Sequence, residues 1–181
     1  MIYVNVPYYK GDLSKGYNNF MSKLDSGDWA CFIDEDVLLC TSPNWYPTME
    51  KIIYENPDGG LFTCVTNRIG NPEQLIPSHN VNNHDITFHK KVGKELSDLH
   101  GTSVKRARGW TSLLLALTSF DVWKKCGGFV KTEHGMLGVD NEYDKSVRNA
   151  GYVTYIMQGV YLYHWYRGDG TASFGECVPN L

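Results

Sequence analysis

Three consecutive acidic residues, Asp34, Glu35 and Asp36, follow directly after the apolar run Trp29–Ile33. A short, continuous apolar run is typical of a strand buried in a parallel sheet, and open α/β sheets bind ligands at the carboxyl ends of such strands. Carboxylates that lie this close repel one another unless a cation or hydrogen bonds offset their charge. The sequence therefore predicts a divalent-metal site here, with an acidic surface turn as the alternative.

Two further segments place chemically useful side chains next to predicted elements. Asp140 lies at the start of a helix expected over residues 140–150, where the helix dipole favours a carboxylate; simple capping of the helix is the alternative. His164 and Arg167 follow a strand expected over residues 160–163. Because neutral imidazole can ligate a metal and guanidinium pairs with phosphate, both are candidate site residues. The other histidines lie at no ligand spacing and are assigned no metal: His79, His84, His89, His100 and His134.

The elements that must position these residues alternate between strands and helices. Strands are expected at residues 2–6, 29–33, 61–66, 111–117, 153–157 and 160–163. Helices are expected at residues 12–24, 47–55, 92–99 and 140–150, with a short one through Val122 and Trp123 that ends at Gly127 and Gly128. This alternation is typical of an α/β protein, so we expect a mostly parallel, Rossmann-like sheet flanked by helices.

The chain of 181 residues is long enough for one domain with a core and short for two. We therefore expect a single domain over residues 1–181, with residues 1–66 carrying the acidic cluster and residues 110–181 carrying Asp140 and His164. Residues 67–109 between them are rich in Asn, His, Pro and charge. We expect this segment to be the least regular part of the fold and to border the site, either as a mobile lid or as a solvated surface excursion.

Composition narrows the class of protein. A net charge of -3 disfavours nucleic acid and membrane surfaces as partners, and no run approaches the roughly 18 apolar residues of a membrane span. The five cysteines are odd in number, widely spaced and without a C-x-x-C pair, which indicates reduced thiols. The chain begins with an apolar, strand-like run and not with a leader, so we expect a cytoplasmic protein.

The order of these features along the chain resembles the GT-A glycosyltransferases, most closely the large family-two group of inverting nucleotide-sugar transferases, in a shortened form. The resemblance spans nearly the whole chain and rests on five segments in order: Val6-Pro7-Tyr8-Tyr9, Asp34-Glu35-Asp36, Gly127-Gly128-Phe129, Val139-Asp140-Asn141-Glu142 with Ala150-Gly151-Tyr152, and Tyr163-His164.

The resemblance implies a reaction and a role for each candidate residue. A sugar would move from a nucleotide-diphosphate donor, a UDP- or GDP-sugar, to a hydroxyl of a glycan or another acceptor, with Mn²⁺ or Mg²⁺ as cofactor. By this resemblance the metal ligands are Asp36 and His164, and the general base is Asp140. It also implies donor contacts from Pro7 and Tyr8, with Tyr8 stacking on the base, from Asp34 at the ribose or a metal-bound water, and from Arg167 at a phosphate.

The sequence also departs from the family, and two other functions fit some of its features. The family's usual second strand, before the acidic cluster, is missing; Val139 stands where the family has Glu, and Ser146 where it often has Arg. These departures motivate a non-catalytic domain that binds a nucleotide sugar or glycan. The other alternative is a haloacid-dehalogenase-type phosphatase, with Asp34 as nucleophile, Asp36 as acid/base, and Asp140 with Asp144 as its distal acidic pair.

Overall fold

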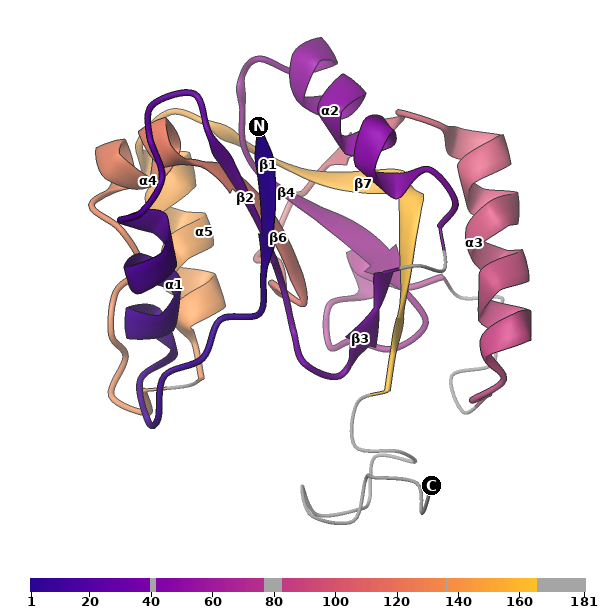
Figure 1. Cartoon of the computed structure of the whole chain (residues 1–181), viewed down its shortest axis with the longest axis horizontal. Coiled ribbons are helices and arrows are strands. Elements are labelled where there is room, and N and C mark those ends of the chain that lie inside the picture. Colours follow the sequence, from indigo (N-terminus) through magenta and orange to yellow (C-terminus); the bar gives the residue numbers. More distant parts are fainter. Residues whose placement is uncertain (40–41, 77–82, 136, 166–181) are drawn as a thin grey trace.

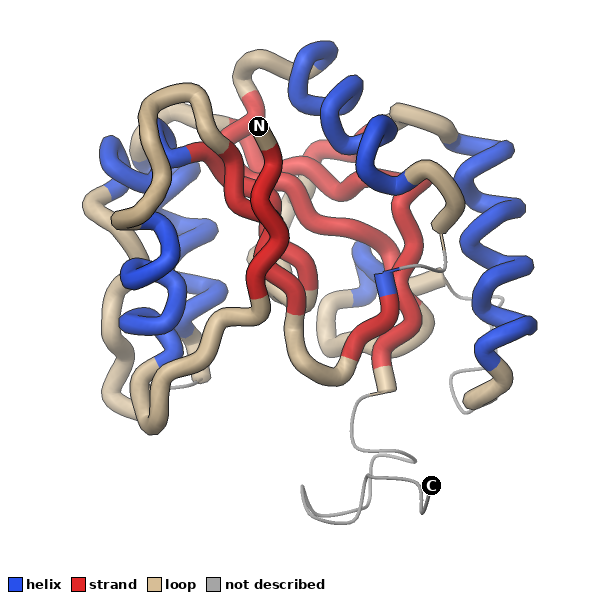
Figure 2. Tube along the Cα trace, viewed as in Figure 1, coloured by secondary structure: helices blue, strands red, loops and turns tan. Residues whose placement is uncertain are grey.

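The computed structural model describes residues 1–39, 42–76, 83–135 and 137–165 (Figure 1). Its strands are β1 (Ile2–Asn5), β2 (Trp29–Ile33), β3 (Val37–Leu38), β4 (Gly59–Thr66), β5 (Val104–Arg106), β6 (Leu115–Ser119) and β7 (Val153–His164). Its helices are α1 (Leu13–Met21), α2 (Trp45–Glu55), α3 (Ile86–His100), α4 (Phe120–Cys126) and α5 (Val139–Asn149), with a 3-10 turn, η2 (Pro72–Gln74). Together they form a single α/β domain (Figure 2).

The sheet is mixed, so the expectation of a mostly parallel sheet was wrong. Its strand order is β1-β2-β6-β4-β7-β3, with β5 also paired to β7. The pairs β1–β2 and β4–β7 are parallel, whereas β6 runs antiparallel between β2 and β4, and β3 and β5 run antiparallel to β7. The four strands β1, β2, β4 and β7 nevertheless share one direction, and their carboxyl ends meet at one edge of the sheet.

Strand β6 is shorter than the expected strand at residues 111–117 because the chain before it bonds to side chains. The Ser112 N–H donates to Gln74 Oε1 at 2.8 Å, and the Leu113 N–H donates to Asp140 Oδ2 at 3.0 Å. Backbone groups used in this way cannot join the ladder of a neighbouring strand. The segment therefore runs past the helix α5 terminus before it enters the sheet at Leu115.

An aromatic core holds α1, α4 and α5 together on one face of the sheet. Phe129 stacks between Tyr17 and Tyr143, with ring centroids 4.2 Å and 3.8 Å away. The Asn18 side chain of α1 clamps the backbone of Phe129, accepting from its N–H at 2.9 Å and donating to its carbonyl at 2.8 Å. This packing fixes the start of helix α5, and with it Asp140, relative to β2.

One feature of β7 is an interruption in its pairing with β4. Met157 pairs with Cys64, but the next residue of β4, Val65, pairs with Tyr161, so residues 158–160 are left over. The sequence had indicated two separate strands here, at residues 153–157 and 160–163, whereas the structure has one continuous strand of 12 residues. Gly159 passes so close to Gly101 that a Cβ on it would collide with the Gly101 carbonyl oxygen.

Residues 67–109 are more regular than the composition suggested. They contain η2, β5 and α3, which at 15 residues starts well before the expected helix at 92–99. Asp85 caps α3 by accepting from the Thr87 N–H at 2.8 Å. The helix packs its buried His89, Val92 and Leu96 near the sheet cluster that includes Tyr161. Residues 67–109 are therefore not wholly an irregular loop region, because a helix, a short strand and a 3-10 turn lie within them. Among the helices described, none is both long and apolar enough for a membrane span.

Candidate functional site

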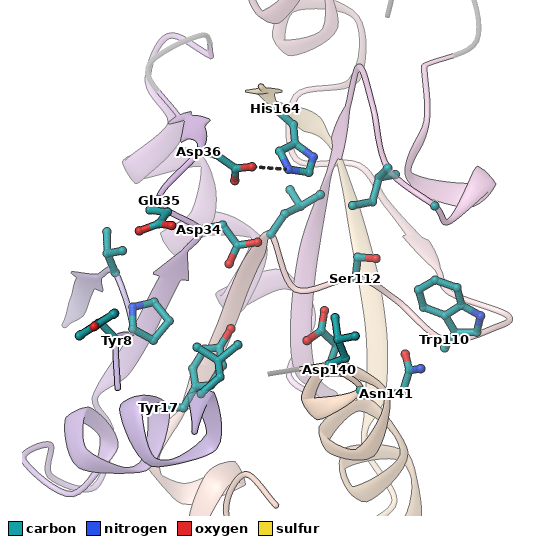
Figure 3. A pocket seen from close by; sticks show the side chains of 18 residues that line it. Tyr8, Tyr17, Asp34, Glu35, Asp36, Trp110, Ser112, Asp140, Asn141 and His164 are labelled. Carbon is teal, nitrogen blue, oxygen red and sulfur yellow. Dashed lines mark ion pairs between the residues drawn. The ribbon is translucent and has the colours of Figure 1, made fainter. Parts of the chain in front are cut away.

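A cavity of about 770 Å³ lies at the sheet edge where β1, β2 and β7 end (Figure 3). Most of the sequence-predicted site residues line it together: Pro7, Tyr8, Asp34, Asp36, Asp140 and His164. Arg167 lies outside the described residues. Residues that are distant in sequence thus reach one cavity because parallel strands deliver their carboxyl ends to the same edge.

The acidic cluster enters the cavity from the end of β2. Asp34 and Asp36 are half-buried, and Glu35 between them is exposed. Burial and the nearby carboxylates of Asp140 and Asp36 raise the pKa of Asp34 to about 7. Water and opposite charge do not fully offset this concentration of negative charge, which is the condition that favours a bound cation. Glu35 and Asp36 form the turn between β2 and β3, as the alternative of an acidic turn expected, but all three acidic side chains also line the cavity.

His164 is held at the end of β7 by three hydrogen bonds to Asn67 and Arg68, the two residues that follow β4. Its N–H donates to Asn67 Oδ1 at 2.8 Å, and its carbonyl accepts from Asn67 Nδ2 at 3.3 Å. Its ring Nδ1 lies 2.7 Å from the Arg68 carbonyl oxygen, which can only accept, so Nδ1 carries the proton. The other ring nitrogen, Nε2, lies 3.2 Å from Asp36 Oδ2 (Figure 3).

The Asp36–His164 pair has the donor set of a divalent-metal site. In the neutral ring, Nε2 presents a lone pair towards a carboxylate oxygen, and both atoms are metal ligands. Two neighbouring ligands at about 2.1 Å in an octahedral site lie roughly 3 Å apart, close to the spacing observed. No group of three or more His, Cys, Asp or Glu ligands converges within the described residues. Asp36 and His164 could hold a divalent ion only if water or a substrate phosphate supplied its remaining ligands.

Asp140 faces the acidic cluster from the first turn of α5. The N-cap of this helix is Gly138, with φ of 83°, so Asp140 lies inside the first turn and is not the capping residue. Burial raises the pKa of Asp140, although the Leu113 N–H, 3.0 Å from Oδ2, acts in the opposite direction. A buried carboxylate with a raised pKa is a better proton acceptor near neutral pH than an exposed one.

The walls of the cavity carry aromatic side chains on opposite sides. Figure 3 shows Tyr8 on the side of the acidic cluster and Trp110 on the other, beside Asn141. Both rings reach solvent, with 75% of Tyr8 and 50% of Trp110 exposed. Tyr17 lies buried beneath the cavity, where burial and the charges of Asp34 and Asp140 raise its phenol pKa.

Sequence reasoning missed two residues that matter to the geometry. Asn67 follows β4 directly and holds His164 in place, so the rule that located Asp34 after β2 also applied to it. Trp110 gave no signal, because its place at the cavity depends on the Asn71 side chain donating to its carbonyl at 2.6 Å. The two positions that depart from the glycosyltransferase pattern do not line the cavity: Val139 is fully buried in the core, and Ser146 donates to the Glu142 carbonyl within α5.

Comparison with protein-family models and with curated proteins finds no match to this chain. Its function is therefore argued from the site itself.

Proposed function

We propose that the protein is a metal-dependent glycosyltransferase that moves a sugar from a nucleotide-diphosphate sugar to an acceptor hydroxyl. One observation carries this proposal: Asp36 and His164, 128 positions apart in the chain, meet at 3.2 Å in a cavity that Asp140 enters from the other side. A metal-binding pair, a separate candidate base and room for a ligand thus occur in one place.

The donor half of the cavity would bind the nucleotide diphosphate. Asp36 and His164 would hold Mn²⁺ or Mg²⁺, which when bound offsets the charge of the departing diphosphate. Asp34, next to this pair, is placed to accept a hydrogen bond from the ribose or from ordered water. Tyr8, with an exposed ring at the end of β1, offers a flat surface for the base.

The acceptor half would carry out the proton transfer. Asp140 lies on the opposite wall from the metal-binding pair, so its carboxylate can accept the proton of a hydroxyl that enters between them (Figure 3). A positioned general base of this kind contributes about 10²–10⁴ to the rate. The raised pKa of Asp140 suits this role, because a stronger base removes a hydroxyl proton more readily.

Metal-dependent donor binding tests the proposal directly. UDP and GDP, each with Mn²⁺ and with EDTA, would be titrated into the protein and followed by thermal shift, since a ligand of the folded state raises its stability. We expect stabilisation by at least one nucleotide with Mn²⁺ and none with EDTA. The substitution Asp36→Asn should abolish the stabilisation by nucleotide and Mn²⁺. The control Asp98→Asn, which changes an exposed carboxylate on α3, should not.

The same panel separates the two alternatives. A haloacid-dehalogenase-type phosphatase would respond to vanadate, and would hydrolyse a phosphate monoester through Asp34. In this fold the acidic cluster follows β2 and not the chain's first strand, which is less suited to that enzyme class. A non-catalytic domain would bind the nucleotide sugar with Mn²⁺ but release no nucleotide when an acceptor is supplied.

A further inference from the structure

A second cavity, of about 570 Å³, has a strongly cationic lining. It is lined by Lys105, Arg106, Ala107, Arg108 and Arg148, so none of its described lining residues is acidic. This concentration of positive charge contrasts with the chain's net charge of -3. Such a local reversal of sign attracts anions, and guanidinium groups pair with carboxylates and phosphates through two hydrogen bonds at once.

Two of these cations are already fixed by the protein. Arg148 donates to Asp144 Oδ1 at 3.0 Å and to the carbonyls of Ala107 and Gly109 at 2.9 Å and 2.8 Å. Lys105 lies 3.3 Å from Glu73. These bonds hold the framework of the cavity and engage the carboxylates of Asp144 and Glu73.

The other two cations are exposed and available to a ligand. Arg106 and Arg108 form no ion pair with any described carboxylate. A bound anion would meet two guanidinium groups that the fold itself does not neutralise.

The lining of the cationic cavity adjoins, along the chain, the proposed acceptor side of the active site. Arg148 bonds to the Gly109 carbonyl, and the next residue, Trp110, lines the catalytic cavity. Along helix α5, Asp140 and Arg148 are eight positions apart, which corresponds to about 12 Å. A chain-like acceptor whose hydroxyl reaches Asp140 could therefore extend past Trp110 towards the cations.

We infer that the acceptor is an acidic glycan, with one sugar packed on Trp110 and a carboxylate or phosphate further along bound by Arg106 and Arg108. This inference rests on the proposed function for the role of the ligand, but the binding it predicts needs no donor. A half-exposed indole offers an apolar surface to the C–H face of a pyranose, and the paired guanidiniums select against neutral glycans. A nucleic acid is disfavoured because the chain carries a net charge of -3 and its described cationic cavity is small.

Direct binding in EDTA, with no nucleotide present, tests this. The probes are tetragalacturonate, which carries a carboxylate on every sugar and so needs no particular register, and neutral maltotetraose of the same length. Calorimetry should show tetragalacturonate binding at least about tenfold more tightly, with an affinity that falls as salt rises. A charge-matched oligonucleotide that binds as tightly as tetragalacturonate would overturn the assignment to a glycan.

Variants locate the binding. The double substitution Arg106→Ala with Arg108→Ala should weaken tetragalacturonate by about tenfold or more and leave maltotetraose unchanged. Trp110→Ala should weaken both sugars by a similar factor. The matched control is Lys90→Ala with Lys91→Ala, which removes two exposed cations from α3. Equal losses in the control, or no preference for the acidic sugar, would overturn the inference.

The outcome is distinguishable from failure of the transferase proposal. If UDP and GDP do not bind with Mn²⁺ but tetragalacturonate binds through Arg106 and Arg108, the acidic-glycan site stands and only the donor chemistry fails. If a nucleotide binds with Mn²⁺ but tetragalacturonate does not, the transferase proposal stands and the acceptor assignment fails.

Discussion

Replacing Asp140 by Asn separates its proposed role as base from its role in the fold. An amide oxygen can still accept from the Leu113 N–H, now 3.0 Å from Oδ2, so the local geometry should survive. The change from a charged to a neutral acceptor costs about 1 kcal/mol. The lost proton acceptor should lower transfer by about 10²–10⁴, which corresponds to about 2.7–5.4 kcal/mol of activation free energy.

The variant should also show a pH signature. Burial raises the pKa of Asp140 above its usual 3.8, so the folded state binds this proton more tightly than the unfolded state. The stability from this group is therefore complete below pH 3.8 and is lost as pH rises through the raised pKa. The asparagine side chain of this variant cannot ionise, so it does not lose this stability. The melting temperature of Asp140→Asn, measured relative to that of the native protein, should therefore rise as pH goes from acidic to neutral.

Two assays check this reasoning together. Calorimetry with nucleotide and Mn²⁺ should give a donor Kd within about twofold of the native value, while single-turnover transfer falls by the factor above. Glu142→Gln is the matched control, because Glu142 is an exposed carboxylate in the same helical turn and does not line the cavity. Equal loss of donor affinity and transfer, or a fall in transfer below tenfold, would refute the assignment of Asp140 as base.

Three further predictions follow from the site and the fold. Asp36→Asn should weaken Mn²⁺-dependent nucleotide binding by about a hundredfold or more in calorimetry, and a residual response equal to the native one would exclude Asp36 as a ligand. Gly159→Ala should destabilise the protein by about 2 kcal/mol or more in urea unfolding, since its Cβ meets Gly101 backbone, whereas Gly109→Ala, with open space, should change it little. Asp144→Ala should cost about 2–3 kcal/mol in the same assay, because it removes the buried carboxylate that accepts from Arg148 and Thr154. A loss below about 1 kcal/mol would contradict this.

The sequence was most informative where one residue type repeats over a short run. The sequence predicted both β2 and the place of the cavity. A strand buried in a sheet is a continuous run of apolar residues, and the acids that follow β2 line the cavity. Helices α1, α2 and α5 lie within a few residues of their predicted bounds, because each has a clear apolar face or a glycine stop. These patterns lie within one segment of the chain, so they can be recognised without knowledge of the fold.

The features that were missed depend on contacts between distant segments. The direction of β6 follows from its neighbours β2 and β4, and nothing within its own five residues encodes it. Helix α3 was underestimated because its buried face includes His89 and Gly93, which give a weak apolar pattern. Trp110 and Asn67 entered the site through bonds to residues far along the chain, and no periodicity reveals such bonds.

Residues 158–160, which have no partner in β4, decide which side chain of β7 meets Asp36. Alternate residues of a regular strand share a face, so Ile156 and His164 would lie on the same side. Three extra residues, an odd number, reverse this parity: Tyr161 joins Ile156 in one cluster, and Leu162 joins Met157 in the other. Deleting one of the three would present a neighbour of His164 to Asp36 instead, whereas deleting two would keep the histidine in place. A segment that lies outside the candidate site therefore helps to set which side chain pairs with Asp36.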